Sequence, residues 1–248
     1  MAATQSPSLL ELQSYLIPGL PSSVYYIPAF LPPATCDVLL DTILATPSPR
    51  WTNLSRRRLL SLPSPLTGKS RDTLVSSAPL PAYLTDEILP NFQTLGIFNY
   101  SPHGAPNHVL VNEYLPGQGI MPHEDGPAYH PVTATVSLGS STVLDIYSKA
   151  GSESDGSERR HWRVLQEPGS LLVTMADSYT ETLHGIAETW VDEDLREETV
   201  SNWGLLGSRD EFRQGCNSRN PRVSLTYRDV KKVVWVGGRA KNNILGNR

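Results

Sequence analysis

The chain from His108 onward reads as a series of short β-strands separated by turns rich in Gly and Pro, and this pattern limits the fold more than any other feature. Strands are predicted at 108–115, 133–138, 142–147, 161–166, 170–175, 188–191 and 222–230. Many short strands with turn residues between them favour an antiparallel sandwich or barrel. The 21 Pro and 18 Gly among 248 residues also suit a loop-rich β protein better than a helical bundle.

The N-terminal part is predicted to hold one strand, at 24–30, and two helices. The first helix starts at Pro32-Pro33 and runs to Pro47, because Val38, Leu39 and Ile43 form an apolar stripe at helical spacing. The second spans 83–95 and is interrupted by Pro90. We therefore expect an α+β protein in which a double-stranded β-helix (jelly-roll) core is backed by N-terminal helices.

The length suits one substantial domain rather than two. We place that domain at 23–236, between an irregular N-terminal segment at 1–22 and a flexible tail at 237–248. Two polar inserts break the strands, at about 149–161 and 192–221, and the second is acidic at its start. In a jelly roll this second insert is expected on a surface loop, and the rim of a site is one place for that loop.

Charge and cysteine content bound the environment of the chain. The net charge of −4 and a sequence pI of about 5.9 exclude a strongly basic, non-specific nucleic-acid binder, although the stretch from Arg50 to Arg71 is locally basic. Two cysteines, Cys36 and Cys216, form neither a disulfide framework nor a zinc motif. Without a signal peptide or a bilayer-spanning apolar run, we expect a monomer in the nucleus or cytoplasm with no membrane partner.

A candidate metal site is carried by His123, Asp125 and His184. Residues i and i+2 of a strand point to the same side, so His123 and Asp125 can reach one metal ion. Two imidazoles and one carboxylate bind one face of Fe(II) and leave three positions open. The alternative is a His–Asp hydrogen bond at a strand end together with an unrelated core histidine.

The run from Arg222 to Arg228 alternates polar and apolar residues, which directs Arg222, Ser224, Thr226 and Arg228 to one face. Asn112 and Tyr114 repeat the i, i+2 geometry on the strand upstream of the metal motif. Buried arginines need an anionic partner, because an unpaired buried charge is costly. A dicarboxylate co-substrate would supply that partner.

The order Asn-x-Tyr, His-x-Asp, distant His and Arg-x5-Arg resembles the AlkB-like Fe(II)/2-oxoglutarate-dependent dioxygenases. The resemblance extends over most of the chain but not over the two inserts or the tail. It implies a jelly-roll enzyme that uses Fe(II), 2-oxoglutarate as co-substrate and O2. The catalytic metal ligands would be His123, Asp125 and His184, and the 2-oxoglutarate contacts would be Asn112, Tyr114, Arg222, Ser224 and Arg228. For Arg228 a structural salt bridge is an open alternative, and for Asn112 and Tyr114 an ordinary strand role.

The resemblance also implies a lid for substrate recognition at about 47–81, a stretch rich in Ser, Pro and Arg with few strand signals. Trp51, Arg57 and Arg58 could stack a base and hold phosphates there, and Tyr129 could line the substrate mouth. Trp51 packed as a core residue is the alternative. Leu62-Pro63 stands where relatives carry an aromatic-Gly pair, which weakens this assignment.

An N-alkylated nucleobase in DNA or RNA is the favoured substrate, with oxidative demethylation as the reaction. A protein-directed hydroxylase or demethylase stays open, as does a non-catalytic binding protein that retains the jelly roll.

Overall fold

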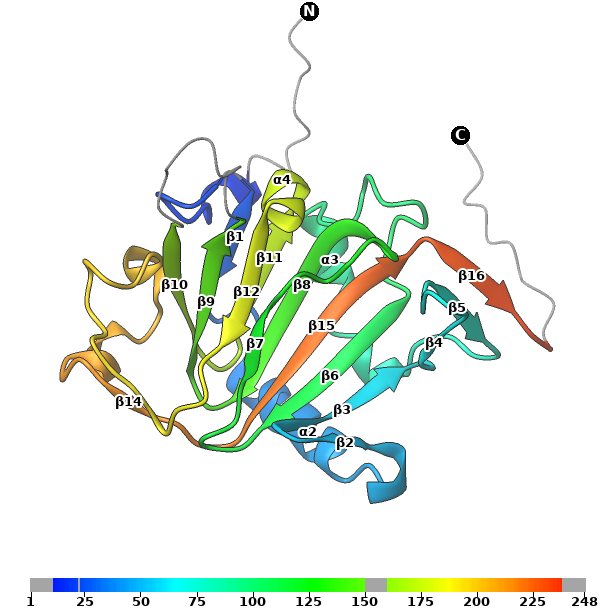
Figure 1. The fold of residues 1–248 in the computed structure, drawn as a ribbon, viewed down its shortest axis with the longest axis horizontal. Coiled ribbons are helices and arrows are strands. Elements are labelled where there is room, and N and C mark those ends of the chain that lie inside the picture. Colours follow the sequence, from blue (N-terminus) through cyan, green and yellow to red (C-terminus); the bar gives the residue numbers. More distant parts are fainter. Residues whose placement is uncertain (1–10, 22, 150–159, 238–248) are drawn as a thin grey trace, which may run out of the picture.

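The computed structural model describes residues 11–21, 23–149 and 160–237. Within these ranges two antiparallel sheets face each other (Figure 1), and the expected jelly-roll core of an α+β protein is confirmed. Half of the predicted N-terminal segment, the tip of the first insert and all but the first residue of the predicted tail lie outside the described residues. Among the described residues, no helix has both the length and the apolar character needed to cross a bilayer.

Seven strands form the larger sheet, and the long strand β15 lies at its centre. In spatial order they are β1 (Val24–Ile27), β11 (Leu171–Met175), β8 (Tyr129–Gly139), β15 (Arg222–Val230), β6 (His108–Tyr114), β3 (Arg57–Leu62) and β2 (Thr52–Leu54). The facing sheet has four strands, β10 (His161–Gln166), β9 (Thr142–Ser148), β12 (Thr182–Ile186) and β7 (Ile120–His123). This topology brings β15 and β7, which are far apart in sequence, to the same interior.

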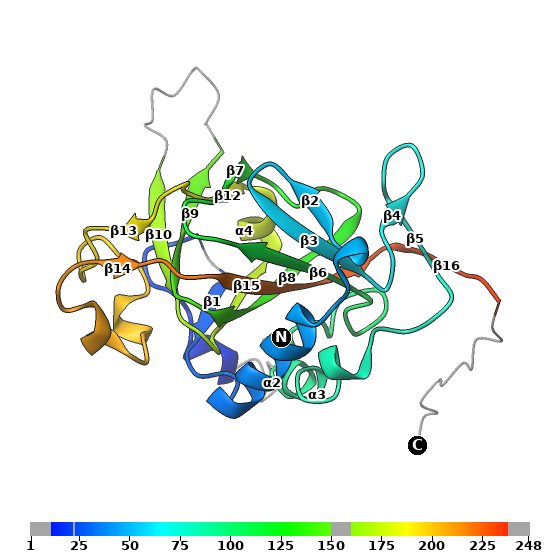
Figure 2. The same ribbon diagram turned by 90° about the horizontal axis from the view of Figure 1, so that it is seen from below.

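Helices α2 (Pro33–Leu44) and α3 (Leu89–Thr94) cover the outer face of the seven-stranded sheet (Figure 2). The main hydrophobic core lies between these helices and the sheet, where Ile43 of α2 and Phe92 of α3 pack with Val223, Leu225 and Tyr227 of β15. The alternation predicted for β15 is thus confirmed on its apolar face. The second predicted helix is shorter than expected: a 3-10 turn occupies Ala82–Leu84, and α3 begins next to Pro90 instead of being interrupted by it.

The prediction of a strand-poor loop over 47–81 was wrong. This region forms β2, β3, β4 (Leu66–Thr67) and β5 (Thr73–Ser76), and β5 pairs in parallel with β16 (Lys232–Trp235). Pairing with β6, in which Leu60 lies opposite Val111, and burial of Leu60 and Leu62 give β3 its stability. That stabilisation is non-local, so the Arg- and Ser-rich sequence does not show it.

The strand predicted at 188–191 was also misplaced. The structure has β12 at Thr182–Ile186 and only the short β13 (Val191–Asp192) after it. Gly185 makes β12 a weak strand by sequence. Glycine is required there because a Cβ would lie 2.9 Å from the carbonyl oxygen of Ile120 on β7.

The insert at 192–221 is a packed layer on the outer face of the four-stranded sheet. Leu195, Val200, Leu206 and Phe212 share a hydrophobic cluster with Val143 of β9 and Leu165 of β10. The insert also contains the 3-10 turns η3 (Trp203–Leu205) and η4 (Arg209–Phe212) and the short β14 (Asn217–Ser218). Its acidic residue Asp192 forms a buried ion pair with Arg219, 2.5 Å between Oδ1 and Nη2. The segment that was expected to be a surface loop therefore packs against the four-stranded sheet and supports it.

Candidate iron and 2-oxoglutarate site

A cavity of about 290 Å³ lies between the two sheets and collects the residues that the sequence singled out. Strands β6, β8 and β15 provide one wall, and β7, β9 and β12 provide the other. Predicted residues on the cavity wall are Arg57, Asn112, Tyr114, His123, Asp125, Tyr129, His184, Arg222, Ser224, Thr226 and Arg228. The polar face predicted for β15 is therefore the face that lines the cavity.

His123, Asp125 and His184 converge at this cavity, with their ligand atoms all within 4.8 Å of one another. His123 ends β7 and lies opposite His184 of β12 in the strand register, so the two rings approach to 4.5 Å between centroids. Asp125 follows the end of β7, and its Oδ1 lies 4.0 Å from Nε2 of His184. The predicted convergence of these three side chains is confirmed.

The ring of His123 is oriented by the backbone. Its Nδ1 lies 2.9 Å from the carbonyl oxygen of Met121, which can only accept a hydrogen bond, so Nδ1 carries the proton. The lone pair is then on Nε2, the atom left for a metal. Burial lowers the pKa of His184 to about 4, which leaves this imidazole neutral near neutral pH. The neutral imidazole is the form that binds divalent metals.

Asp125 is held by Arg228, whose Nη2 donates to its Oδ1. Burial alone would raise the pKa of Asp125, but Arg228 and His184 overcome that effect and lower it. The guanidinium of Arg228 also lies over the ring of Tyr129, 4.9 Å from its centroid. Arg228 therefore keeps the carboxylate ionised and fixes one of its oxygens.

Arg222 lies at another part of the cavity wall and is 3% exposed. Its Nη2 donates to Oε1 of Gln166 at 2.6 Å and to Oγ of Ser137 at 2.8 Å, both neutral acceptors. Its Nε has no hydrogen-bond partner among the described residues. Burial lowers the pKa of Arg222 to about 10, and Asp192 offsets this only in part, without forming an ion pair with it among the described residues. A buried, incompletely bonded cation of this kind matches an anionic ligand.

The polar residues of β6 and β15 complete the wall near these arginines. Asn112 lies opposite Ser224, and Tyr114 lies opposite Arg222, whose guanidinium is 5.9 Å from the tyrosine ring centroid. Oδ1 of Asn112 accepts a hydrogen bond from Nε of Arg57 at 3.1 Å. Arg57 is thereby fixed against the cavity wall rather than extended into solvent.

The other predicted substrate residues lie differently from the sequence expectation. Trp51 is 5% exposed and belongs to the hydrophobic core, so its ring is not available to stack a base. Arg58 lies over that ring at 4.2 Å and donates through Nη2 to Oε1 of Glu113 at 3.0 Å. The core alternative describes Trp51 better, and Arg58 is an internal ion-pair partner. Tyr129 does line the cavity, next to Arg228.

Several residues that support the site were missed from the sequence. Gln166 and Ser137 contact Arg222, and the strand alternation of β10 and β8 could have pointed to them. Tyr179, in the short helix α4 (Ala176–Thr180), donates from its hydroxyl to the carbonyl oxygen of Gly126 at 3.0 Å. No local sequence signal predicts this contact, which ties α4 to the loop that carries Asp125.

The residues present fit Fe(II) and 2-oxoglutarate. Two imidazoles and one carboxylate make a mixed N/O donor set suited to Fe(II), and they form the only group of three such side chains found among the described residues. Arg222, with its unbonded Nε on the same cavity, offers a planar guanidinium to a carboxylate. Both parts of the fit rest on side chains that the fold buries.

Comparison with known proteins agrees with this geometry. The family model of the 2OG-Fe(II) oxygenase superfamily matches residues 23–228. A protein of Danio rerio named "Probable RNA/DNA demethylase ALKBH6" is 39% identical over 236 residues, which are 91% of this chain and 93% of that protein. The tRNA (carboxymethyluridine(34)-5-O)-methyltransferase alkbh8 of Xenopus tropicalis is 29% identical over 157 residues, 62% of this chain and 23% of that protein.

Among solved structures, OsALKBH1 superposes with a TM-score of 0.52 at 17% identity, covering 85% of this chain and 98% of the other, which shows the fold. Proteins of this superfamily use Fe(II), 2-oxoglutarate and O2, and the His-Asp-His triad is in place here. The chain belongs to the 2OG-Fe(II) oxygenase superfamily and, within it, to the AlkB-like dioxygenases.

Proposed function

We propose that this enzyme oxidatively demethylates an N-alkylated nucleobase in DNA or RNA. The oxygenase chemistry follows from its family, and the nucleic-acid substrate is supported by its 39% identity to a protein named as a probable RNA/DNA demethylase. The structural observation that carries the proposal is one cavity with the His123–Asp125–His184 triad and the unsatisfied cation Arg222.

In this proposal His123, Asp125 and His184 hold Fe(II), and Arg222 pairs with the distal carboxylate of 2-oxoglutarate. Asn112, Tyr114 and Ser224 line the wall along the co-substrate. With 2-oxoglutarate and O2, the bound iron supplies the oxidant that hydroxylates a substrate C–H bond. On an N-methyl group, the hydroxymethyl product breaks down to formaldehyde and the demethylated nitrogen.

The residues of the chain contribute positioning and exclusion of water rather than proton transfer. Arg228 orients the carboxylate of Asp125, and the carbonyl of Met121 orients the ring of His123. Leu144, Ile146 and Leu172 provide apolar surface in the cavity near its polar wall. These contacts fix where the reacting groups meet before any substrate arrives.

The substrate mouth is proposed beside Arg57 and Glu124, which line the cavity together with His123. The region at 47–81 is proposed as the lid, because β3, which it contributes, carries Arg57 on the cavity wall. We also propose the single domain at 23–236 and a nuclear or cytoplasmic location, as the sequence favours.

The experiment is formaldehyde release from N-methylated single-stranded DNA and RNA oligonucleotides, with Fe(II) and 2-oxoglutarate. The proposal expects formaldehyde and succinate in equal amounts, and none from an Asp125→Ala variant that stays folded. Succinate without formaldehyde on every oligonucleotide, together with turnover of a methylated or hydroxylatable peptide, would support the protein-directed alternative. Failure of the wild-type protein to bind Fe(II) and 2-oxoglutarate would leave only the binding-protein alternative.

A further inference from the structure

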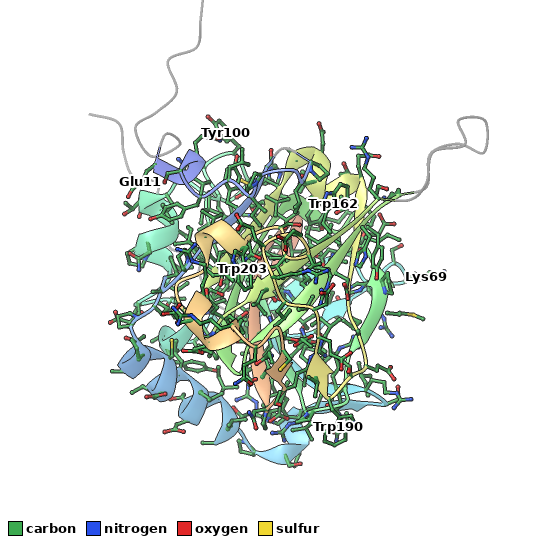
Figure 3. The ribbon with its side chains drawn as sticks, turned by 90° about the vertical axis from the view of Figure 1, so that its left-hand side faces the viewer. Glu11, Lys69, Tyr100, Trp162, Trp190 and Trp203 are labelled. Carbon is green, nitrogen blue, oxygen red and sulfur yellow. The ribbon has the colours of Figure 1, made fainter. Side chains whose placement is uncertain are left out.

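Trp190 is 69% exposed, unusually for so large an apolar side chain, and it follows the strand that carries His184. Figure 3 shows it at the periphery of the molecule, away from Trp162 and Trp203. Aromatic residues are enriched at interfaces, but a single exposed ring is ordinary on a protein surface, so the contacts around Trp190 decide what it can do.

The backbone around Trp190 is fixed on both sides. Its carbonyl oxygen accepts a hydrogen bond from the backbone N of Arg219 at 2.9 Å, and the carbonyl of Ala187 accepts from Nη1 of the same arginine at 2.7 Å. Arg219 is itself locked in its buried ion pair with Asp192. The insert at 192–221 thus holds the loop 187–190 in one place.

The indole rests on Gly117, in the turn between β6 and β7. A Cβ at Gly117 would lie only 3.0 Å from Cε2 and Nε1 of Trp190, so only glycine allows the ring to pack this closely. The backbone N of Gly117 also donates to the carbonyl of Thr189 at 3.1 Å. One side of the ring is therefore supported, and most of the side chain is left to solvent. We call the indole of Trp190, supported in this way by Gly117, the Trp190 platform.

Short chain segments connect the platform to the wall of the catalytic cavity. The turn that contains Gly117 runs between Tyr114 and Ile120, and the loop that contains Trp190 follows Ile186. All three of these flanking residues line the cavity. A polymer with one residue in the cavity would therefore pass close to the Trp190 platform.

A cation lies beside the platform. Nε of Arg56, at the turn between β2 and β3, is 3.2 Å from Oε2 of Glu188, two residues before Trp190. Both side chains are well exposed, 60% for Arg56 and 44% for Glu188. An exposed ion pair of this kind contributes little to stability, so a stronger anion can replace Glu188 as the partner of Arg56.

We propose that the Trp190 platform stacks a base that flanks the target base of a single-stranded nucleic acid, with Arg56 taking the adjoining phosphate from Glu188. This rests on the proposed function and names the surface that holds the polymer. Single-strand binders combine an exposed aromatic ring with a nearby cation in this way. The platform takes the role that was predicted for Trp51, which the fold buries.

The first test is binding of fluorescein-labelled single-stranded DNA and RNA of about 12 nucleotides to the full chain. Trp190→Ala is expected to weaken binding about 5- to 100-fold, while Trp190→Phe retains most of it. Trp235→Ala is the matched control, because Trp235 is also exposed, at 53%, but lies on β16, and the cavity lining includes no residue of that strand. Equal affinity of Trp190→Ala and wild type would overturn the proposal.

The ion pair gives a second test with opposite signs. Arg56→Ala is expected to weaken binding, and Glu188→Gln, which frees Arg56 for phosphate, is expected to tighten it at the same salt concentration. A purely structural role of the pair predicts that both changes act in the same direction. Weaker binding by Glu188→Gln would therefore count against the phosphate role.

Turnover of a methylated oligonucleotide separates failure of this inference from failure of the proposed function. The inference expects Trp190→Ala to raise KM for the oligonucleotide without changing kcat or the affinity for 2-oxoglutarate. If the wild type turns over the oligonucleotide and the variant matches it in KM, only the platform is excluded. If the wild type neither binds nor demethylates any oligonucleotide, the nucleic-acid substrate is excluded as well.

Discussion

Arg228 donates a hydrogen bond from Nη2 to Oδ1 of Asp125, and both side chains are almost completely buried. The arginine strand β15 and the loop after β7 are thereby joined inside the cavity. Arg228 is thus a structural salt-bridge partner of a proposed iron ligand. This was the open alternative to direct contact with 2-oxoglutarate.

Replacing Arg228 by Ala is expected to lower Fe(II) affinity about 10- to 100-fold, because the carboxylate of Asp125 loses the group that orients it. Arg228→Lys keeps the positive charge but lacks the planar guanidinium donors, so its Fe(II) affinity should lie between those of wild type and Arg228→Ala. The measurement is an anaerobic Fe(II) titration, with circular dichroism to confirm folding. Arg196→Ala, which removes only exposed ion pairs, is the control. Wild-type affinity in a folded Arg228→Ala variant would contradict this role.

His108 is expected to make the fold sensitive to acid. It lies on β6, buried opposite Arg228 of β15. The hydroxyl of Ser61 donates to the carbonyl of Ser64, so its Oγ accepts from Nε2 of His108 at 2.8 Å. Nδ1 is then an acceptor without a donor, and Nε of Arg228 is a donor without an acceptor among the described residues. Burial, followed by the charge of Arg228, lowers the pKa of His108 from 6.5 to about 3.

The sign follows from proton binding. Between about pH 6.5 and about pH 3 the unfolded chain protonates His108 and the folded chain does not, so stability is complete above this window and falls as pH falls through it. Through His108, the free energy of unfolding is expected to be about 2 kcal/mol lower at about pH 5 than at neutral pH. Urea unfolding at both pH values should show a smaller loss for His108→Gln. An identical loss in variant and wild type would contradict the buried neutral histidine.

Arg219→Ala is expected to destabilise the protein by about 3–5 kcal/mol, because it leaves Asp192 buried without its cation. The double variant Arg219→Met/Asp192→Leu should recover much of that loss, since no charge is then left unpaired. Denaturant unfolding measures both. A loss of stability below about 1 kcal/mol for Arg219→Ala would mean that the Arg219–Asp192 pair is no stronger than an exposed ion pair. It would then not support the Trp190 loop as proposed.

The site residues were predictable from sequence where strand periodicity alone determines the face to which a side chain points. Arg222 and Arg228 share a face because they lie six residues apart on one strand, and the strand register is continuous from Arg222 to Arg228. His123 and His184 came from motif order, and the register that pairs β7 with β12 places them together. Local periodicity was sufficient for the two arginines, whereas His184 was predicted from the order of motifs in the family that the chain resembles.

The predictions that failed concern residues whose positions depend on non-local contacts. Trp51 beside arginines suggested an exposed aromatic, but the pairing of β2 and β3 with the sheet buries it under Arg58. Trp190 has no motif around it, and its role depends on Gly117 and Arg219, which meet it only in the fold. The insert at 192–221 looked like a polar loop because its few apolar residues are widely spaced, although they converge on β9 and β10.

The central claim is that the triad and Arg222 form one site for Fe(II) and 2-oxoglutarate. An anaerobic titration that follows the visible metal-to-ligand charge-transfer band tests it most directly, on wild type, Asp125→Ala and Arg222→Ala. The account predicts a band only when both Fe(II) and 2-oxoglutarate are present, no band in Asp125→Ala, and a much higher 2-oxoglutarate requirement in Arg222→Ala. No band in folded, reduced wild type, or an unchanged 2-oxoglutarate requirement in Arg222→Ala, would contradict it.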